Sequence, residues 1–531
     1  MHNQALSTTT PAAQGMSAGT TGTAARRPRL GEGAALYFAT LALALVALPG
    51  LTGCADMSGI ASTAQARDAA SLGLGTPSTG TAGTSGTAPG TLQVDAAVPA
   101  DWWRGFGDAQ LDALVQQALA TSPSLKLAEA RIARAAAFTE TARAAQGPQL
   151  NGSLDANRQL YSQNGPYPAG QAGRILSVET ARLSGSWEID FFGKNRAALA
   201  SAVGAANAAQ ADAEAARLLL AANVARNYMQ LARLQAQLQV AERTLAQRNE
   251  TLQLVQGRLT AGLDTQLELR QSEGGLPEAR QQIEALREQM ALTRNAIGAL
   301  VGEPNAAAAL VPPALEAIQS IAIPSALPAD LLGRRPDVAA ARWRVEAATQ
   351  DTAVARAQFY PNVSLNAFVG LSSLGLSNFI EAGSKEWGVG PALRLPIFDS
   401  GRLRANLRGK SADLDAAIES YNSALIDAVH DAADQLASTA SIGRQLAEQR
   451  QAQDAAEGAY AIARQRYEAG LGNYLNVLTA ETNVLAQRRQ AVDLAARRLD
   501  NQVALMRALG GGYQAAPVST AAAGMRATAA H

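Results

Sequence analysis

The chain has 531 residues, and its 45 lysine and arginine residues balance 45 aspartate and glutamate residues, so the formal net charge is zero. This balance argues against a basic nucleic-acid surface and against an acidic tail for a basic partner. One cysteine and three histidines supply no disulfide, no thiolate metal cluster and no acid–base set, so we expect no metal, no cofactor and no enzymatic activity. His430, the only histidine away from the chain ends, is interpreted as a polar helix residue.

Residues 1–53 have the order of a secretory signal. Three arginines, Arg26, Arg27 and Arg29, precede a short apolar run at residues 36–48, which is typical of an exported protein. The alternative is a single transmembrane anchor, but the run is short for a span of about 20 residues. The stretch before residue 24 is unusual for a signal, which leaves Met16 open as the translation start.

The apolar run is followed by Leu51-Thr52-Gly53-Cys54, a string that resembles the lipobox of bacterial lipoproteins. The resemblance implies that the sulfur of Cys54 is acylated and that Cys54 becomes the first residue of the mature chain. Ala55, which follows it in place of an aspartate, favours sorting to the outer membrane by the same resemblance.

Residues 54–100 are expected to form a lipidated N-terminus and a flexible linker. From Ser58 to Gly90 the chain is almost entirely Gly, Ser, Thr and Ala, which cannot bury enough apolar area to offset the entropy of ordering. Residues 514–531 are similar in composition and are predicted to form a disordered tail.

An internal duplication organises the rest of the chain. Placing Pro123 on Pro336 without a gap also aligns Arg131 with Arg344 and Pro148 with Pro361. A second register aligns Arg258 with Arg466, Leu267 with Leu475 and Gly302 with Gly510. We therefore predict a first repeat at 101–305, a linker at 306–335 and a second repeat at 336–513, each ordered helix, strand, strand, long helix, shorter helix.

Two strands are predicted in each repeat, because apolar and polar residues alternate with period two. In the second copy the alternation runs from Val363 to Leu371 and from Trp387 to Ile397; in the first it covers 150–160 and 175–189 less clearly. About ten residues suffice for a tilted strand to cross a membrane, with lipid on one face and water on the other.

The long helices are predicted at about residues 194–256 and 402–466. In the first, five apolar residues fall at seven-residue spacing: Val224, Leu231, Leu238, Leu245 and Leu252. In the second, apolar residues keep mostly three- and four-residue steps: Leu414, Ile418, Tyr421, Leu425, Ala432 and Leu436. Both patterns are typical of coiled coils. At 1.5 Å per residue each helix is on the order of 95 Å long, a length that a tube across the periplasm requires.

Four membrane-length strands cannot close a barrel alone, because an open sheet leaves unpaired backbone groups in hydrocarbon. If the strands cross the membrane, the chain must oligomerise, and three copies would supply twelve strands around a wide lumen.

Several motifs resemble those of the outer membrane factors, the TolC-like channels, and in particular their lipoprotein branch (NodT-type) in tripartite multidrug pumps. They cover about residues 101–513 and comprise DWWRGF (101–106), WEIDFFGK (187–194), RRPD (334–337), LPIFDSGR (395–402) and ALGGG (508–512). The resemblance implies a mainly α fold with a membrane β-barrel, formed by a homotrimer with a twelve-stranded β-barrel in the outer membrane and a twelve-helix α-barrel below it. It further implies a passive duct for small molecules, supplied by an inner-membrane transporter through a periplasmic adaptor protein.

Two glycine turns between helices are the predicted periplasmic tips. Gly262 and Gly470 suit the left-handed position that ends a helix, and a hairpin turn alone would explain them. The resemblance adds that these turns dock the adaptor, through Arg258, Ala261, Gly262, Leu263, Arg466, Ala469, Gly470 and Leu471. It also places the aperture at Tyr467, Leu475, Asn476 and Thr479. Because these four side chains are neutral, we predict an apolar constriction at Leu475, with Asp264 and Glu268 able to restore some negative charge.

Other classes of protein account for less of the sequence. A lipoprotein coiled coil that tethers the membrane to the wall explains the lipobox and heptads but not the strands or the duplication. A periplasmic enzyme lacks a paired acid–base set or metal ligands. Within the channel class, type I protein secretion in place of small-molecule efflux stays open.

Overall fold

The computed structural model describes residues 57–67, 98–303, 310–321 and 334–514, and all of them belong to one compact unit. The predicted signal, the acylated Cys54, most of the linker and nearly all of the C-terminal tail lie outside the described residues.

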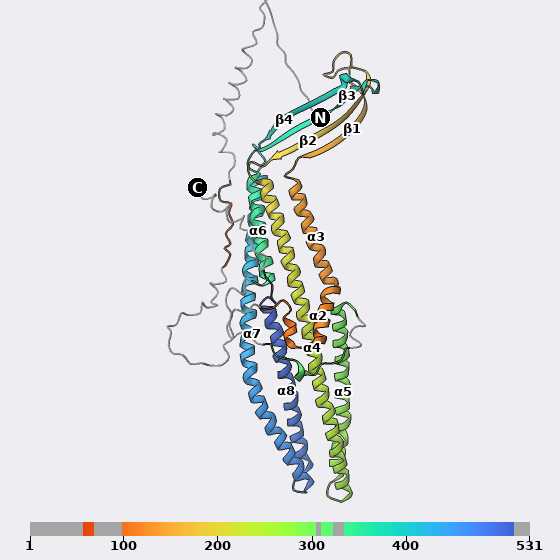
Figure 1. Ribbon diagram of the computed structural model, residues 1–531, viewed down its shortest axis with the longest axis vertical. Coiled ribbons are helices and arrows are strands. Elements are labelled where there is room, and N and C mark those ends of the chain that lie inside the picture. Colours follow the sequence, from red (N-terminus) through yellow and green to blue (C-terminus); the bar gives the residue numbers. More distant parts are fainter. Residues whose placement is uncertain (1–56, 68–97, 304–309, 322–333, 515–531) are drawn as a thin grey trace, which may run out of the picture. The chain divides into compact units, whose positions relative to one another are not determined.

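The duplication predicted from the sequence is confirmed by matching helices. Each copy has a 22-residue helix that begins with proline, a 67-residue helix and a shorter one that returns beside it (Figure 1). Proline suits the first helical position, because its missing N–H has no partner there in any case. The helices of the first copy are α3 (Pro123–Ala144), α4 (Lys194–Thr260) and α5 (Gln266–Val301), and those of the second are α6 (Pro336–Ala357), α7 (Arg402–Glu468) and α8 (Tyr474–Ala508).

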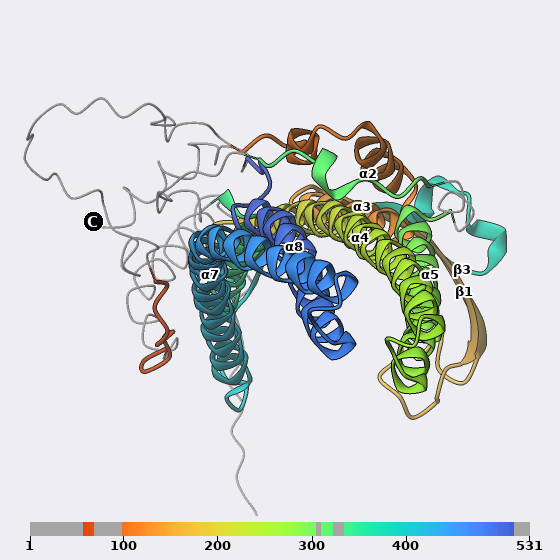
Figure 2. The ribbon, with the colours of Figure 1, turned by 90° about the horizontal axis from the view of Figure 1, so that it is seen from below.

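The two long helices are continuous, and different helices fill the space between them along their length. Near the strands, α6 contacts both α4 and α7; toward the helix turns, α8 takes this place. Seen from below, α5, α4, α8 and α7 follow one another along a curve (Figure 2). This order brings the α4–α5 hairpin directly against the α7–α8 hairpin.

The main core lies midway along α4. There η3 (Trp102–Phe106) and α2 (Ala109–Thr121) cover the buried Val224, Leu231 and Leu238. Farther down α4 the buried side chains turn toward α7 and α8, where Val255 packs with Tyr460, Tyr467 and Tyr474. Of the predicted seven-residue row, Leu245 and Leu252 are therefore only half-buried.

The four strands form one antiparallel sheet in the order β1-β2-β3-β4, which confirms the predicted mixed fold. The strands are β1 (Gln149–Leu160), β2 (Ile175–Ile189), β3 (Asn362–Leu374) and β4 (Lys385–Arg394). Alternation to Ile397 was expected, but β4 ends at Arg394, because Arg394 lies opposite Asn362, the first residue of β3, and this partner strand continues no further.

One face of this sheet is apolar across all four strands. The register places Leu154 opposite Ala181, Leu183 opposite Val369, and Val369 opposite Trp387. The large apolar side chains of this face are exposed in the single subunit: Leu150, Leu154, Leu183, Trp187, Leu365, Val369, Trp387, Val389 and Leu393. We call these residues the apolar sheet face. An exposed apolar surface of this extent marks contact with lipid or protein.

The opposite face of the sheet is polar. Arg182 on β2 pairs with Glu386 on β4 at 2.6 Å and lies 4.5 Å from the centre of the Phe368 ring. Ser184 and Asn366 belong to the same face. A sheet with one apolar and one polar face requires a different medium on each side.

Part of the N-terminal linker lies along α7. The carboxylate of Asp415 accepts a hydrogen bond from the hydroxyl of Ser62 at 2.6 Å, and the side-chain oxygen of Asn422 accepts one from the N–H of Arg67 at 2.9 Å. Residues 58–67 of the predicted flexible linker therefore contact α7, whose side chains supply hydrogen-bond partners for this polar segment.

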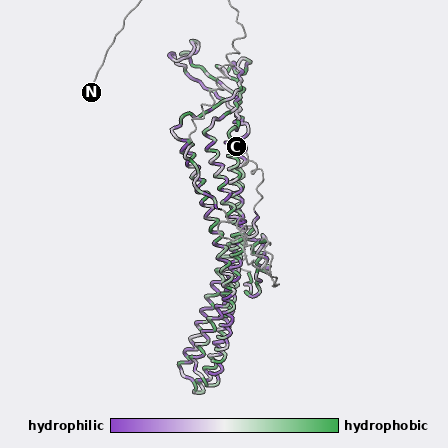
Figure 3. Tube along the Cα trace, turned by 90° about the vertical axis from the view of Figure 1, so that its left-hand side faces the viewer, coloured by the Kyte–Doolittle hydropathy of each residue, from purple (hydrophilic) through white to green (hydrophobic). Residues whose placement is uncertain are grey.

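Hydrophobic and hydrophilic positions are interspersed along the helices (Figure 3). In the described part of the chain, no helix combines the length and the apolar composition needed to cross a membrane.

Candidate aperture at the helix turns

The two predicted tips have the same backbone geometry. Gly262 and Gly470 adopt φ angles of 73° and 72°, in the left-handed region that glycine enters without strain. In each turn the following leucine N–H bonds back to an arginine carbonyl, Leu263 to Arg258 at 2.9 Å and Leu471 to Arg466 at 2.7 Å. This pattern satisfies carbonyls that the end of a helix leaves free.

The helices that leave the turns are capped by side chains. Thr265 and Glu268 form a capping box at the start of α5, and Asn473 accepts the N–H of Asn476 at the start of α8. Each cap satisfies a backbone donor that the helix itself leaves free. The turns are therefore well-defined structures that hold the leucines at their tips in fixed positions.

The turns are joined by a cluster of Arg258, Asp264 and Tyr467, which we call the tip cluster. The guanidinium of Arg258 pairs with the carboxylate of Asp264 at 3.1 Å and donates to the backbone carbonyl of Tyr467 at 2.9 Å. It also lies 4.5 Å from the centre of the Tyr467 ring, and the hydroxyl of Tyr467 donates to Asp264. Three residues from two hairpins thus form one closed polar network.

The tip cluster is largely buried, and its contacts change the pKa values of Arg258 and Tyr467. Hydrogen bonding to Asp264 raises the pKa of Arg258, and burial together with the bond to Asp264 raises the pKa of Tyr467. Both groups therefore remain protonated donors across the physiological pH range.

The structure separates the four predicted aperture residues into two sets. Leu475, Asn476 and Thr479 lie on one exposed stretch of the first turns of α8, with Leu475 58% exposed. Tyr467 is fully buried in the tip cluster, so in the subunit its side chain contacts Arg258 and Asp264. Asp264 is likewise engaged with Arg258, so the negative charge that it was expected to supply is neutralised.

Four leucines are exposed around the turns in two equivalent pairs. Leu263 and Leu471 occupy the same place in the two copies, as do Leu267 and Leu475. Of the other predicted tip residues, Arg466 is exposed and donates to the carbonyl of Leu471 at 3.3 Å, whereas Arg258 is drawn inward. Comparison of the copies shows part of this difference, because Asp264, which pairs with Arg258, aligns with Gly472, which has no carboxylate for Arg466. It does not show the bond to the Tyr467 carbonyl, which lies 209 positions from Arg258.

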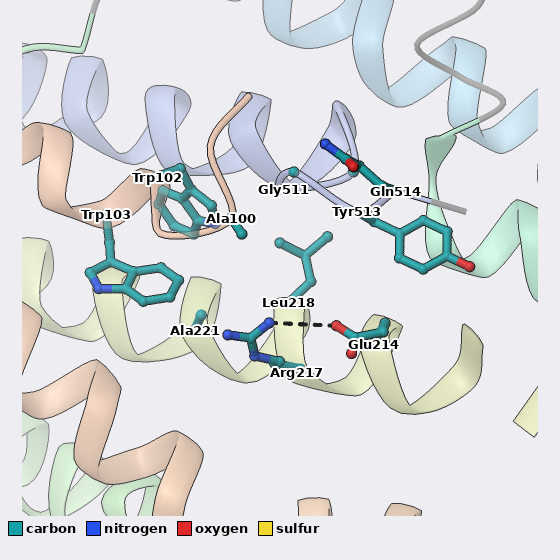
Figure 4. Close-up of a pocket in the computed structure, with 12 residues that line it drawn as sticks. Ala100, Trp102, Trp103, Glu214, Arg217, Leu218, Ala221, Gly511, Tyr513 and Gln514 are labelled. Carbon is teal, nitrogen blue, oxygen red and sulfur yellow. Dashed lines mark ion pairs between the residues drawn. The ribbon is translucent and has the colours of Figure 1, made fainter. Parts of the chain in front are cut away.

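A hollow of about 250 Å³ lies at the middle of the helices, beside the turn that follows α8 (Figure 4). Trp102 and Leu218 line it, and Arg217 pairs with Glu214 at 3.6 Å at its side. Gly512, in a left-handed conformation, packs against the backbone of Ala100 here. The DWWRGF motif (101–106) and the ALGGG motif (508–512), from the two ends of the folded region, therefore pack together here.

Neither the histidines nor the acids of the described residues form a metal site. His430 is exposed on α7 and lies 3.4 Å from Asp434 on the next turn. Among residues 57–67, 98–303, 310–321 and 334–514, no three His, Cys, Asp or Glu side chains are grouped to hold a metal ion.

The fold and the paired helix turns define a class of protein. The chain matches the outer membrane efflux protein family over residues 114–303 and 327–511, which correspond to the two copies. It belongs to this family, and its function is efflux at the bacterial outer membrane.

Individual relatives agree with this assignment. The chain is 34% identical over 428 residues to the multidrug resistance outer membrane protein MdtP of Escherichia coli (strain K12), covering 79% of this chain and 88% of MdtP. It is 33% identical over 423 residues to the pyoverdine export outer membrane protein OpmQ of Pseudomonas aeruginosa, covering 79% of this chain and 89% of OpmQ. The match to the fusaric acid resistance protein FusA of Burkholderia cepacia is 41% over 323 residues, spanning 60% of this chain and 61% of FusA.

Solved structures share the fold. The outer membrane protein VceC of Vibrio cholerae has a TM-score of 0.75 at 36% identity, covering 78% of this chain and all of VceC. The outer-membrane channel OprN has a TM-score of 0.73 at 28% identity, covering 79% of this chain and 94% of OprN.

Proposed function

We propose that three copies of this chain form a passive exit duct for small molecules through the outer membrane. The observation that carries this proposal is the apolar sheet face, which is exposed on every strand and opposed by a polar face. In hydrocarbon the apolar face is solvated by lipid, and the polar face lines water.

The edges of the sheet require the additional copies. In the described residues β1 pairs only with β2, and β4 pairs only with β3, so each outer edge carries unpaired backbone groups. An open edge is excluded from the bilayer core. Pairing of β4 with β1 of the next copy removes both edges, and three copies of four strands enclose an aqueous lumen.

The helix turns are proposed as the periplasmic end of this duct. Leu475, with Asn476 and Thr479 beside it, forms the constriction when three copies converge, and the tip cluster holds each subunit in its closed arrangement. The exposed Leu263 and Leu471 are the proposed contacts for the helical hairpins of an adaptor protein, which connects the duct to an inner-membrane transporter.

A covalent lipid on Cys54 is the proposed second membrane attachment. Replacement by Cys54→Ser should abolish incorporation of labelled palmitate. An unchanged label in this variant would show that Cys54 is not the acylation site.

The trimeric duct is tested by extracting the full chain from membranes in mild detergent, measuring its mass and recording its conductance in planar bilayers. A trimer that conducts supports the proposal. A monomer or dimer that leaves the membrane without detergent contradicts it, because the apolar sheet face would then have no lipid contact.

A further inference from the structure

The interface between α4 and α8 contains a row of ion pairs in which α4 supplies arginine and α8 supplies the acid. Arg226 pairs with Asp500 at 2.8 Å, Arg233 with Asp493 at 3.6 Å, and Arg248 with Glu481 at 2.7 Å. Residue numbers rise along α4 as they fall along α8, because the two helices run antiparallel. The row joins the α4–α5 hairpin to the α7–α8 hairpin of the same subunit.

The pairs differ in burial along the row. The side chains of Arg226 and Asp500 are 51% and 42% exposed, whereas those of Arg248 and Glu481 are 14% and 6% exposed. Water and salt screen the exposed pair, which therefore holds the helices weakly. Separating the buried pair leaves the carboxylate of Glu481 buried without a compensating charge, so the pair resists separation strongly.

Arg248 also holds α5. Its guanidinium donates to the backbone carbonyl of Gly275 at 2.7 Å and to the carboxylate of Glu278 at 3.0 Å. One side chain of α4 therefore links α5 and α8.

The turn of α5 that Arg248 contacts is the weakest in that helix. Gly274 and Gly275 are poor helix formers, and Pro277 inside the helix has no N–H to continue the ladder. The equivalent positions of α8 hold Thr482, Asn483 and Leu485. The weak turn is thus confined to one copy, at the place where Arg248 binds it.

There is also space for these side chains to move. A hollow of about 230 Å³ adjoins the pair and is lined by Arg248, Gly275, Tyr474 and Glu481, among others. The pair therefore borders an open hollow on one side.

We propose that the Arg248–Glu481 pair is a latch of the aperture, in addition to the tip cluster. It keeps the two hairpins of a subunit together and must separate before the turns move apart. It lies ten residues along α4 from Arg258, about 15 Å from the tip cluster at 1.5 Å per residue. This inference rests on the proposed duct function. Residues 248 and 481 are positioning residues, since they act on the aperture through the helices that carry it.

The test is the closed-state current of the purified full-length protein in planar bilayers without adaptor. Glu481→Gln keeps the shape of the side chain and removes its charge, so the current should rise at least about tenfold as the buried pair is lost. Asp500→Asn is the matched control, because it makes the same change in the exposed pair, and its current should stay near that of the unmodified protein. Native electrophoresis establishes that each variant remains assembled.

A charge exchange separates the latch from a general structural role. The exchange is made in a Glu278→Gln background, because Glu278 lies 3.0 Å from the guanidinium of Arg248 and would repel a carboxylate introduced there. In that background Arg248→Glu should raise the current, and adding Glu481→Arg should lower it again. An assembled Glu481→Gln protein with unchanged current overturns the latch, as does an Asp500→Asn protein that leaks equally. Leu475→Ser distinguishes a failure of the latch from a failure of the proposed duct function. If Leu475→Ser conducts while Glu481→Gln does not, only the latch is wrong. If no variant conducts, the duct function itself is wrong.

Discussion

Leu475 lies on the first turn of α8 with its side chain mostly exposed, next to the polar Asn476 and Thr479. An apolar ring formed by this residue in three subunits would exclude ions, because it offers no polar groups to replace the water of their hydration shells. The tip cluster behind it carries balanced charges, so the constriction has no strong preference for cations. At this scale the proposed aperture rests on the side chain of Leu475 and on the tip cluster that holds the turn.

Replacing Leu475 by serine should therefore raise the closed-state current, because a hydroxyl permits water and ions to enter the constriction. Planar-bilayer recording of the purified protein measures this directly. Leu292→Ser is the matched control, since Leu292 is equally exposed on α5 but lies far from the turn. Equal currents in the Leu475→Ser and unmodified proteins would exclude Leu475 as the constriction.

Gly512 combines a left-handed backbone conformation with close packing against the backbone of Ala100. Its φ angle is +81°, and a Cβ atom would lie 2.6 Å from the backbone nitrogen of Ala100. Gly512→Ala should therefore lower the thermal midpoint, with a strain of about 1–3 kcal/mol from the left-handed conformation alone.

The control for this substitution is Gly458→Ala in α7. No atom lies within 4 Å of a Cβ placed there, so alanine should stabilise the helix by up to about 1 kcal/mol. Thermal unfolding followed by circular dichroism compares the two variants. A Gly512→Ala protein as stable as the unmodified chain would contradict the packing described at this junction.

At the scale of elements, α7 binds residues 58–67 along its surface. The carboxylate of Asp415 accepts hydrogen bonds from the Ser62 hydroxyl and from the N–H groups of Thr63 and Ala64. These bonds stabilise the ionised carboxylate and lower the pKa of Asp415. The segment is thus fixed to one helix by a charged side chain.

Because the folded-state pKa of Asp415 is lowered, the stabilisation is present above the ordinary carboxyl pKa, near 4, and is lost as pH falls through the lowered value. Hydrogen exchange of the Thr63 and Ala64 amides should therefore stay slow at pH 5. Asp415→Asn should accelerate it, whereas Asp413→Asn, which removes a carboxylate that pairs with Lys410, should not. Fast exchange in the unmodified protein would show that the segment is not held.

At the scale of the whole molecule, the sheet separates two media. Leu183 belongs to the apolar sheet face, and the next residue, Ser184, belongs to the polar face. A charged side chain should be tolerated on one face and not on the other, although the two positions are adjacent in sequence.

Leu183→Arg should cost about 2–4 kcal/mol if the residue lies near the midplane of the bilayer, and less trimer should be recovered from the outer membrane. Ser184→Arg, facing water, should assemble normally. Quantitative native electrophoresis of membrane extracts measures both. Equal recovery of the two variants would mean that the apolar sheet face does not contact lipid.

The sequence by itself determined the repeating parts of this protein. Pro123 and Pro336 start α3 and α6, which are equal in length, and Gly262 and Gly470 follow the ends of α4 and α7 in the same left-handed conformation. Both pairs match because proline and glycine act on the backbone locally. The strands could also be predicted, because successive residues of a strand point to opposite faces of the sheet and their polarity therefore alternates. The exception was the end of β4, which is set by its partner strand: Arg394 lies opposite the first residue of β3.

Only the tertiary structure decided which side chains meet. Tyr467 was expected at an opening and is buried, because Arg258 and Asp264 reach it from the other hairpin. Residues 58–67 belong to the segment expected to be a flexible linker, and Ser62 there donates to Asp415, 353 positions away. Pairing over such separations depends on how the helices pack, and no local preference of the residues encodes it.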